Sequence, residues 1–439
     1  MLLEFQVENY LSFKDIAKLS MIASSSISKN ELQDSIVTLD KINILKSAAI
    51  FGANASGKSN FLDAIGFMNN YIFESAKEST FGEDIAVSSF KLCDETENKP
   101  STFEMTFIIP NDNSKLSSNK HIVFRYGFQL SREKVETEWL FARFTAIESK
   151  LFTRIGNEIK IGDKFKEGKQ VYKIVGDINK ATLFLSLIAN IKGDNAPLTG
   201  MVMNWFSNLR DITAIANDNF VGVTAGIMKN LEAKEDILKA LSFADMAIED
   251  ITVQEKKVDF DVLPNEIKKE INDKNLENWF SITLNTFHSK YNSQKKKTGK
   301  VSFNFEKQES DGTKKFFAII GPILSALKMG LVLVIDEIDA RLHPNLFLVL
   351  ISLFNSKKIN KKNAQLIFAT HNTLVMNKNL LRRDQIYLTK KDKYGESDLY
   401  SLLDYKKVRN DASFNKDYLM GKYDAVPYLG NFESIFSKD

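Results

Sequence analysis

The chain has 439 residues, of which 44% are hydrophobic and 26% charged, with a net charge of +3 and a pI near 8.5. This length exceeds the range in which one hydrophobic core keeps growing, so we expect two or more lobes, and the composition excludes a disordered chain. The charge is too mild to indicate a nucleic-acid-binding protein by itself.

Export signals and membrane segments are absent from the sequence. No window reaches the run of about 18 apolar residues that spans a bilayer, and the start, MLLEFQVENYLSF, lacks the basic residues and cleavage site of a signal peptide. The single cysteine, Cys93, excludes an internal disulfide and a cysteine-based metal site. We therefore expect a cytoplasmic protein that does not contact membranes.

Three strands and a helix are expected near the N-terminus. Residues 3–8 alternate apolar and polar side chains, the period of a half-buried strand, and residues 16–22 and 46–51 predict two more strands. Residues 59–76 place apolar side chains along one helical face.

The middle of the chain changes character twice. Between residues 100 and 165, alternating runs separated by polar turns predict an antiparallel β lobe. From 178 to 277 helical patterns prevail, although EDITVQEKKV predicts a strand, and no heptads are sustained. The segment SQKKKTGK predicts a solvated hairpin turn, with contact to phosphates as the alternative. Its lysines are Lys295, Lys296, Lys297 and Lys300.

Strands and helices alternate after residue 300. The expected order is a helix over 314–328, a strand over 331–335, a helix over 344–354 and a strand over 365–369. This alternation predicts a parallel sheet covered by helices, and hence an α/β fold.

A phosphate-binding loop is predicted at GANASGKS, residues 52–59, which satisfies G-x-x-x-x-G-K-[ST]. Its glycines let successive N–H groups point at phosphate oxygens, Lys58 supplies a cation for the β and γ phosphates, and the Ser59 hydroxyl ligates Mg²⁺. The following helix adds the positive end of its dipole. The alternative is a purely structural glycine turn.

Two acidic residues follow a wholly apolar run in LVLVIDEIDARLHP, residues 331–344. Such a run predicts a central strand, and ligands bind at the carboxyl ends of these strands. Asp336 is expected to hold Mg²⁺ directly or through water, and Glu337 to act as the general base that polarises the attacking water. The alternative is a solvated acidic turn.

A histidine and a second helix start complete the candidate set. His371 follows the strand AQLIFATHN, where it can hydrogen-bond a γ-phosphate. In ESDGTKKFF, Ser310 and Gly312 lie at the N-terminus of a predicted helix. The Ser310 hydroxyl, the Gly312 N–H and the helix N-terminus form a second anion-binding site. One nucleotide does not need two such ends, so we expect the second to serve the nucleotide of a partner subunit. The remaining histidines show no metal-ligand spacing: His121, His288 and His343.

The order of these segments along the chain resembles that in the ABC-type ATPase heads of the SMC, RecF and overcoming-lysogeny-defect group. In those heads the order is a Walker A loop (here with Lys58), a signature (Ser310), a Walker B strand (followed by Asp336 and Glu337) and a switch histidine (His371). VENYLSFKD, FRYGFQL, DEIDARLHP, THNTLV and the tail VRNDASFNKDYLMGKYDAVPYL are similar to AAA family ATPases of bacterial phage defence, typified by RloA and AbiL. The resemblance implies ATP and Mg²⁺ as cofactors. The implied nucleotide contacts are Gly52, Asn54, Ala55, Ser56, Gly57, Lys58, Ser59, Asn60, Ser310 and Gly312. The implied metal ligands are Ser59 and Asp336.

Three positions depart from the family pattern, and a glutamine-loop residue cannot be placed. Ala55 replaces a usual glycine, and Asp311 lies within the signature SDGT where transporters have SGG. Gln129 is the nearest candidate for a glutamine-loop residue, and Asp424 stands where a glycine is expected.

The resemblance implies an ABC-type P-loop fold with a mixed sheet, an antiparallel β lobe and an inserted helical lobe. Residues 1–90 and 300–439 are expected to form the two parts of the ATPase head. Residues 91–165 are expected to form the β subdomain, and residues 166–299 a mostly helical insertion.

Three functions remain open from the sequence. The first is a nucleotide-driven homodimer, or higher homo-oligomer, that hydrolyses ATP in an anti-phage system beside a separate, RloB-like or other nuclease-like effector. The second is a RecF-like or SMC-like repair ATPase that binds DNA directly. The third is a nucleotide-binding scaffold with little turnover, against which the presence of Glu337 argues.

Overall fold

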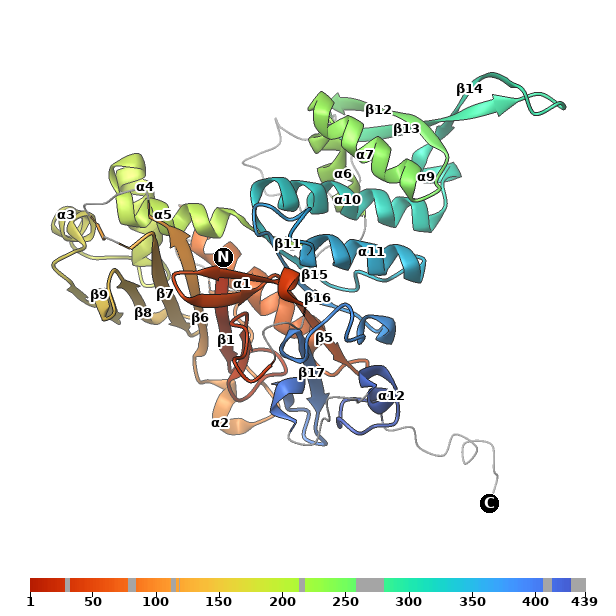
Figure 1. Cartoon of the computed structure of the whole chain (residues 1–439). Helices are drawn as coiled ribbons and strands as arrows, with labels where there is room; N and C mark the ends of the chain where they lie inside the picture. Colours follow the sequence, from red (N-terminus) through yellow and green to blue (C-terminus); the bar gives the residue numbers. More distant parts are fainter. Residues whose placement is uncertain are drawn as a thin grey trace. The chain divides into compact units, whose positions relative to one another are not determined.

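The computed structural model describes residues 1–27, 32–77, 84–111, 116, 117, 119–212, 218–257, 280–405 and 413–427 (Figure 1). The chain forms two compact units. The first contains Met1–Ala214, Ala326–Asp339 and Phe347–Asp439, and the second contains Ile215–Ser325 and Ala340–Leu346. The expected segment 166–299 is therefore divided between them at residue 214. Among the described residues, no helix is both long and apolar enough to span a bilayer.

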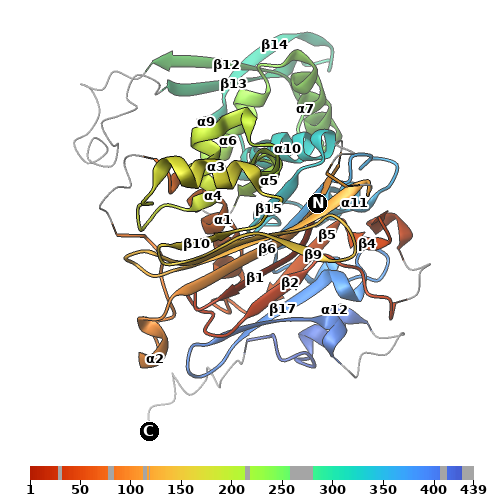
Figure 2. The same ribbon diagram turned by 90° about the vertical axis from the view of Figure 1, so that its left-hand side faces the viewer.

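A seven-stranded antiparallel sheet forms one layer of the first unit, in the order β10-β9-β8-β7-β6-β1-β2 (Figure 2). Its strands are β1 (Leu2–Glu8), β2 (Ala17–Ser20), β6 (Ser101–Pro110), β7 (His121–Leu130), β8 (Val135–Arg143), β9 (Glu148–Ile155) and β10 (Glu158–Ile161). The predicted antiparallel lobe is confirmed. It also includes the N-terminal strand, in which Phe5 lies opposite Met105 with both side chains buried. Alternate residues of β6 are buried, as a sheet with one covered face requires.

Three helices pack against this sheet and belong to the first unit: α3 (Lys166–Val175), α4 (Phe184–Lys192) and α5 (Pro197–Ser207). The ring of Trp205 stacks on Phe107, with 4.0 Å between centroids. The buried Glu138 carboxylate accepts hydrogen bonds from the Phe184 backbone N–H (2.7 Å) and the Tyr126 hydroxyl (2.9 Å). These contacts connect α4 and α5 to the strands.

A six-stranded mixed sheet forms the other layer of the first unit. In order across the sheet, its strands are β11 (Leu209–Ile212), β15 (Val332–Ile335), β16 (Gln365–Ala369), β5 (Ser47–Gly52), β17 (Ile386–Lys391) and β18 (Ser397–Ser401). All neighbours are parallel except β17 and β18. The predicted α/β fold with a mixed sheet is confirmed. Smaller elements of this unit are β3 (Ile36–Leu39), β4 (Ile42–Leu45), α2 (Asp94–Glu97) and α12 (Phe414–Leu419).

Helices directly follow two of these strands. α1 (Lys58–Glu74) begins within the loop after β5, and α11 (Pro344–Asn355) follows β15. Each residue of β5, β15 and β16 is buried, which explains why apolar runs in the sequence marked them correctly.

The second unit combines helices with a three-stranded antiparallel sheet, ordered β12-β13-β14. Its elements are α6 (Asp218–Ile227), α7 (Leu231–Phe243), β12 (Ile248–Lys257), β13 (Phe280–Tyr291), β14 (Lys297–Asn304) and α9 (Phe305–Gln308). Residues 293–296 of the lysine-rich segment lie in the turn between β13 and β14, and residues 297–300 begin β14. The predicted hairpin is therefore confirmed, with a shorter turn.

The helix α10 (Asp311–Met329) begins three residues earlier than predicted and contains Pro322. Proline cannot donate a hydrogen bond to the carbonyl four residues before it. The Thr224 hydroxyl on α6 donates to that carbonyl, on Ala318, at 3.0 Å. A Cβ at Gly321 would lie 2.5 Å from Thr224 Oγ1, so glycine permits this close approach. The proline is thus accommodated by a side chain of a neighbouring helix.

Candidate nucleotide-binding site

Three predicted site segments meet at one edge of the mixed sheet. Ile335 of β15 lies opposite Phe368 of β16, and Ala369 of β16 lies opposite Ile50 of β5. Because the three strands are parallel and in register, the loops that follow them emerge side by side. The phosphate-binding loop, the Asp336–Glu337 pair and His371 are therefore brought together, with β16 between the other two strands.

The two framing glycines are required by close packing. A Cβ at Gly52 would lie 2.3 Å from Thr389 Oγ1 and 2.5 Å from the Thr389 carbonyl oxygen. Gly57 has φ 111°, and a Cβ there would lie 2.6 Å from Ser397 Oγ. The loop is pressed against β17 and β18, and larger residues at these two positions would displace it.

The sequence did not reveal the residues that form hydrogen bonds with the loop and hold it in place. The hydroxyls of Ser56 and Thr389 are hydrogen-bonded at 2.6 Å. The Asn60 side chain donates to Ser12 Oγ at 2.8 Å, and Ser397 Oγ donates to the same atom at 2.8 Å. The side chains of Ser56 and Asn60, expected to contact nucleotide, thus bond to protein groups, whereas Asn54, Ala55 and Ser59 are exposed.

The Lys58 side chain bends back onto the phosphate-binding loop. Its ammonium donates to the carbonyl oxygens of Gly52 (3.0 Å) and Ala53 (2.9 Å), and the side chain is buried. Burial lowers the pKa of Lys58, while the negative charges of nearby carboxylates oppose that shift. Those carboxylates are Asp336, Glu337 and Asp339. The loop cation and the acidic segment therefore act on each other electrostatically, as a shared phosphate and metal site requires.

The acidic segment has a strained backbone at the predicted general base. Glu337 is exposed and adopts φ 45°, and its backbone N–H donates to Asp336 Oδ1 at 3.0 Å. A left-handed residue other than glycine or asparagine is uncommon and is often held in place at functional sites. Asp339, which the sequence analysis overlooked, lies half-buried in the same loop. The DEID spacing was the signal that could have revealed it.

His371 lies exposed beyond the end of β16. Partial desolvation by neighbouring groups and then the positive charge of Lys58 lower the pKa of His371 from its ordinary 6.5, against the opposite effect of the three carboxylates. A lowered pKa keeps the imidazole neutral at pH 7, so one ring nitrogen donates and the other accepts a hydrogen bond. Of the other histidines, His288 bonds to Glu309 and His343 accepts the Asn345 N–H.

The signature residues belong to the second unit, whereas the rest of the candidate set belongs to the first. Ser310 Oγ accepts the Thr313 N–H at 3.1 Å, which makes Ser310 the N-cap of α10. A Cβ at Gly312 would lie 3.0 Å from the Arg341 carbonyl oxygen. The Arg341 guanidinium pairs with Asp311 at 3.3 Å, which offsets the negative charge at this helix start.

The described residues contain no group of three or more His, Cys, Asp or Glu side chains able to hold a metal. Mg²⁺ commonly uses one or two carboxylates together with substrate phosphates and water, so such a cage is not required. The Ser59 hydroxyl and the Asp336 carboxylate carry oxygen atoms of the hard type that this ion prefers. Gln129 lies in β7, and its amide bonds to Thr102 (3.2 Å) and Thr137 (3.1 Å), which does not support a glutamine-loop role.

The left-handed conformation of Ala55 leads to a stability prediction. Its φ of 60° costs an L-residue about 1–2 kcal/mol. Glycine removes this cost, but the greater entropy of the unfolded glycine chain favours unfolding by about 0.4–1 kcal/mol, so Ala55→Gly should leave stability unchanged or raise it by up to about 1.6 kcal/mol. Ala55→Val should lower it, because β-branched residues tolerate this region poorly. Chemical denaturation of both variants measures the difference, and equal losses for glycine and valine would contradict the assignment.

A comparison with known protein families identifies the family of the chain. A family model matches residues 47–377, and its description reads "AAA domain, putative AbiEii toxin, Type IV TA system" (AAA_21). No curated protein matches the chain. Among solved structures, the chain is similar to the SMC head domain from Thermotoga maritima, with 14% identity and a TM-score of 0.36. That alignment covers 91% of this chain and 98% of the other.

Proposed function

The chain belongs to the AAA_21 family of P-loop ATPases, and from this premise we propose that it works as an ATP-driven dimeric switch in a bacterial anti-phage system. ATP joins two subunits, and hydrolysis separates them. The observation that carries the proposal is the register of β5, β16 and β15, which gathers a phosphate loop, two acidic residues and a histidine at one sheet edge.

The phosphate loop binds ATP through backbone and side-chain donors. Its N–H groups and the start of α1 face the phosphates, and the Lys58 ammonium moves from the Gly52 and Ala53 carbonyls to the β and γ phosphates. Ser59 and Asp336 would hold Mg²⁺, which would supply positive charge to neutralise the charge that develops on the phosphate oxygens.

Hydrolysis uses the exposed groups beside this loop. Glu337 accepts a proton from water as the water oxygen bonds to the γ-phosphorus, and the bond from that phosphorus to the β,γ-bridging oxygen breaks. ADP and inorganic phosphate leave. The neutral His371 imidazole donates a hydrogen bond to the γ-phosphate and so positions it for the attack.

The second subunit completes each site. Ser310 and Gly312 at the start of α10 form another anion-binding end, in a different unit from the Walker A loop. We propose that this helix N-terminus binds the γ-phosphate of the nucleotide held by the partner subunit. The state of the dimer is then read by a separate, nuclease-like effector, which the sequence resemblance to phage-defence ATPases implies. The family description supports an association with a toxin–antitoxin system.

Mixing two inactive variants tests the shared site. Lys58→Ala removes the loop cation, and Ser310→Arg fills the signature end. Each alone should be inactive, but a heterodimer keeps one intact composite site, so an equal mixture should regain about a quarter of the wild-type rate of phosphate release.

The matched control is a mixture of Lys58→Ala with Glu337→Gln. Both changes damage the half of the site that the same subunit supplies, so their heterodimer has no intact site and should stay inactive. The shared-site assignment would be wrong if the first mixture showed no rescue and the specific activity of the wild type did not depend on protein concentration.

A further inference from the structure

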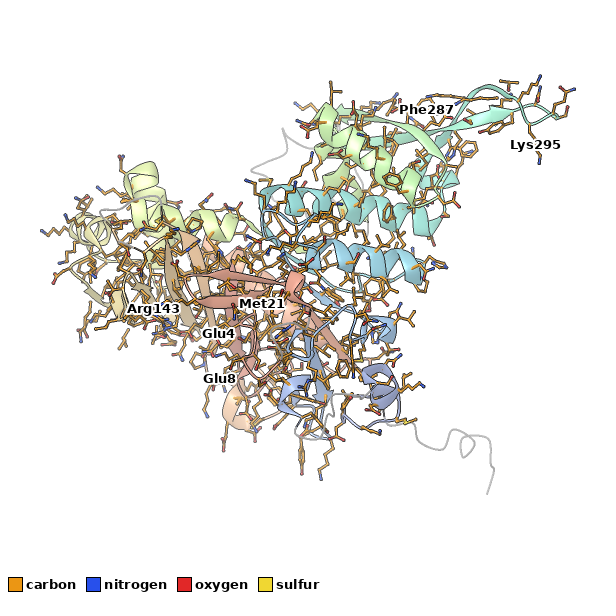
Figure 3. All side chains as sticks on the ribbon, viewed as in Figure 1. Glu4, Glu8, Met21, Arg143, Phe287 and Lys295 are labelled. Carbon is orange, nitrogen blue, oxygen red and sulfur yellow. The ribbon has the colours of Figure 1, made fainter. Side chains whose placement is uncertain are left out.

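The β13–β14 hairpin of the second unit extends beyond the sheet that carries it. Strand β12 begins at Ile248, which pairs with His288. His288 in turn pairs with Val301, so residues 289–300 form a two-stranded ribbon past the start of β12. Figure 3 shows Lys295 at the end of this ribbon.

The ribbon is strongly basic. Residues 289–300 contain five lysines and no aspartate or glutamate. Those lysines are Lys290, Lys295, Lys296, Lys297 and Lys300, and all are exposed. Glu249 of β12 pairs with Lys297 and Lys300. Among the described residues, Lys290, Lys295 and Lys296 have no such carboxylate partner and remain available for an anionic ligand.

The tip of the ribbon is well organised. The Asn292 side-chain oxygen accepts the backbone N–H groups of Gln294 (3.0 Å) and Lys296 (2.9 Å). Lys295 adopts the left-handed conformation, with φ 58°, which the tight turn requires. An ordered turn presents its cations at fixed positions and therefore loses less entropy on binding than a flexible lysine tail would.

We propose that this hairpin binds the sugar–phosphate backbone of duplex DNA. Neighbouring strands lie about 4.7–4.9 Å apart, so a two-stranded ribbon with its side chains fits a B-form major groove about 12 Å wide. The deep, narrow major groove of an RNA duplex does not admit it. Lysines contact phosphates without reading bases, so binding is independent of sequence. A single-strand site would need a row of stacking aromatics, and this ribbon presents Tyr291 alone.

The base of the hairpin is connected to the signature. The His288 ring lies 2.7 Å from Glu309 Oε1, and the Thr286 hydroxyl donates to the same oxygen. Glu309 directly precedes Ser310, the N-cap of α10. The base of the ribbon is therefore hydrogen-bonded to the residue next to the proposed signature. Any effect of bound DNA on ATP hydrolysis rests on the proposed function, whereas DNA binding does not.

Binding is tested without nucleotide, so the result does not depend on ATP hydrolysis. The probe is a fluorescent DNA duplex of about 30 base pairs, followed by anisotropy over a range of salt concentrations. The variant is Lys290→Gln/Lys295→Gln/Lys296→Gln. The matched control is Lys357→Gln/Lys358→Gln/Lys361→Gln, in an exposed basic segment of the first unit.

The hairpin variant should bind on the order of a hundredfold more weakly, with the slope of log affinity against log salt smaller by about 0.9 for each lost phosphate contact. The control should bind like the wild type, and thermal unfolding should show both variants folded. Equal losses in the two variants, no binding by the wild-type protein, or capture of an acidic protein in place of DNA would overturn the proposal. Tighter binding of single-stranded DNA or duplex RNA would overturn the duplex assignment.

Discussion

Replacing Lys58 with alanine should weaken ATP binding by at least about a hundredfold. The ammonium is expected to contact both the β and γ phosphates, and a hydrogen bond to a charged group contributes about 1.5–3 kcal/mol, so two contacts account for a loss of this size. Burial lowers the pKa of Lys58, because a charged ammonium is less well solvated there than in water. Fluorescent-nucleotide titration or calorimetry measures the affinity.

The variant should remain folded. Alanine leaves the Gly52 and Ala53 carbonyls without the lysine donor, but it also removes a buried cation, and these effects oppose each other. Lys77→Ala is the matched control, because Lys77 lies exposed just beyond the end of α1. If Lys58→Ala bound ATP within a few-fold of the wild type, the phosphate-binding assignment of this loop would be wrong.

Glu337→Gln should still bind ATP but hydrolyse it about 10²–10⁴-fold more slowly, because glutamine retains the shape of the side chain and cannot accept the proton from water. Since hydrolysis is proposed to separate the subunits, this variant should accumulate as an ATP-bound dimer. Phosphate release measures the rate, and size-exclusion chromatography with light scattering in ATP and Mg²⁺ measures the dimer.

Glu306→Gln, at an exposed glutamate on α9, is the matched control and should hydrolyse ATP at the normal rate. The double variant Lys58→Ala/Glu337→Gln should stay monomeric, since dimerisation requires bound ATP. Normal turnover by Glu337→Gln would refute the general-base assignment. Asp339→Asn would then test the neighbouring carboxylate, which also contributes to the electrostatic field at Lys58 and His371.

The sequence predicted the centre of the mixed sheet better than its edge. Strands β5, β15 and β16 are short, wholly buried apolar runs, so their bounds followed closely from composition. Strand β17 ends in two exposed lysines and pairs with β5 from a distant part of the chain. No local pattern reveals such a partner. For the same reason, the sequence predicted β1 as a strand but not its pairing with β6 in the antiparallel sheet.

The candidate site, like the mixed sheet, was predicted only in part from the sequence. The phosphate loop, Asp336 and Glu337 were found because their chemistry requires fixed residue types at short spacing. Ser12, Thr389 and Ser397 were missed because they are ordinary polar residues until folding brings them behind the loop. The roles proposed for Lys58, Asp336, Glu337, His371, Ser310 and Gly312 all stay predictions until the variants are measured.

The proline within α10 has a consequence for the evolution of the chain. Thr224, Gly321 and Pro322 form one arrangement, in which the hydroxyl bonds to the carbonyl that the proline leaves without its usual donor and the glycine makes room for it. A change at one of the three positions therefore alters what is tolerated at the other two. We expect related sequences to exchange them as a set, with a bulkier residue at position 321 accompanying the loss of both the hydroxyl and the proline.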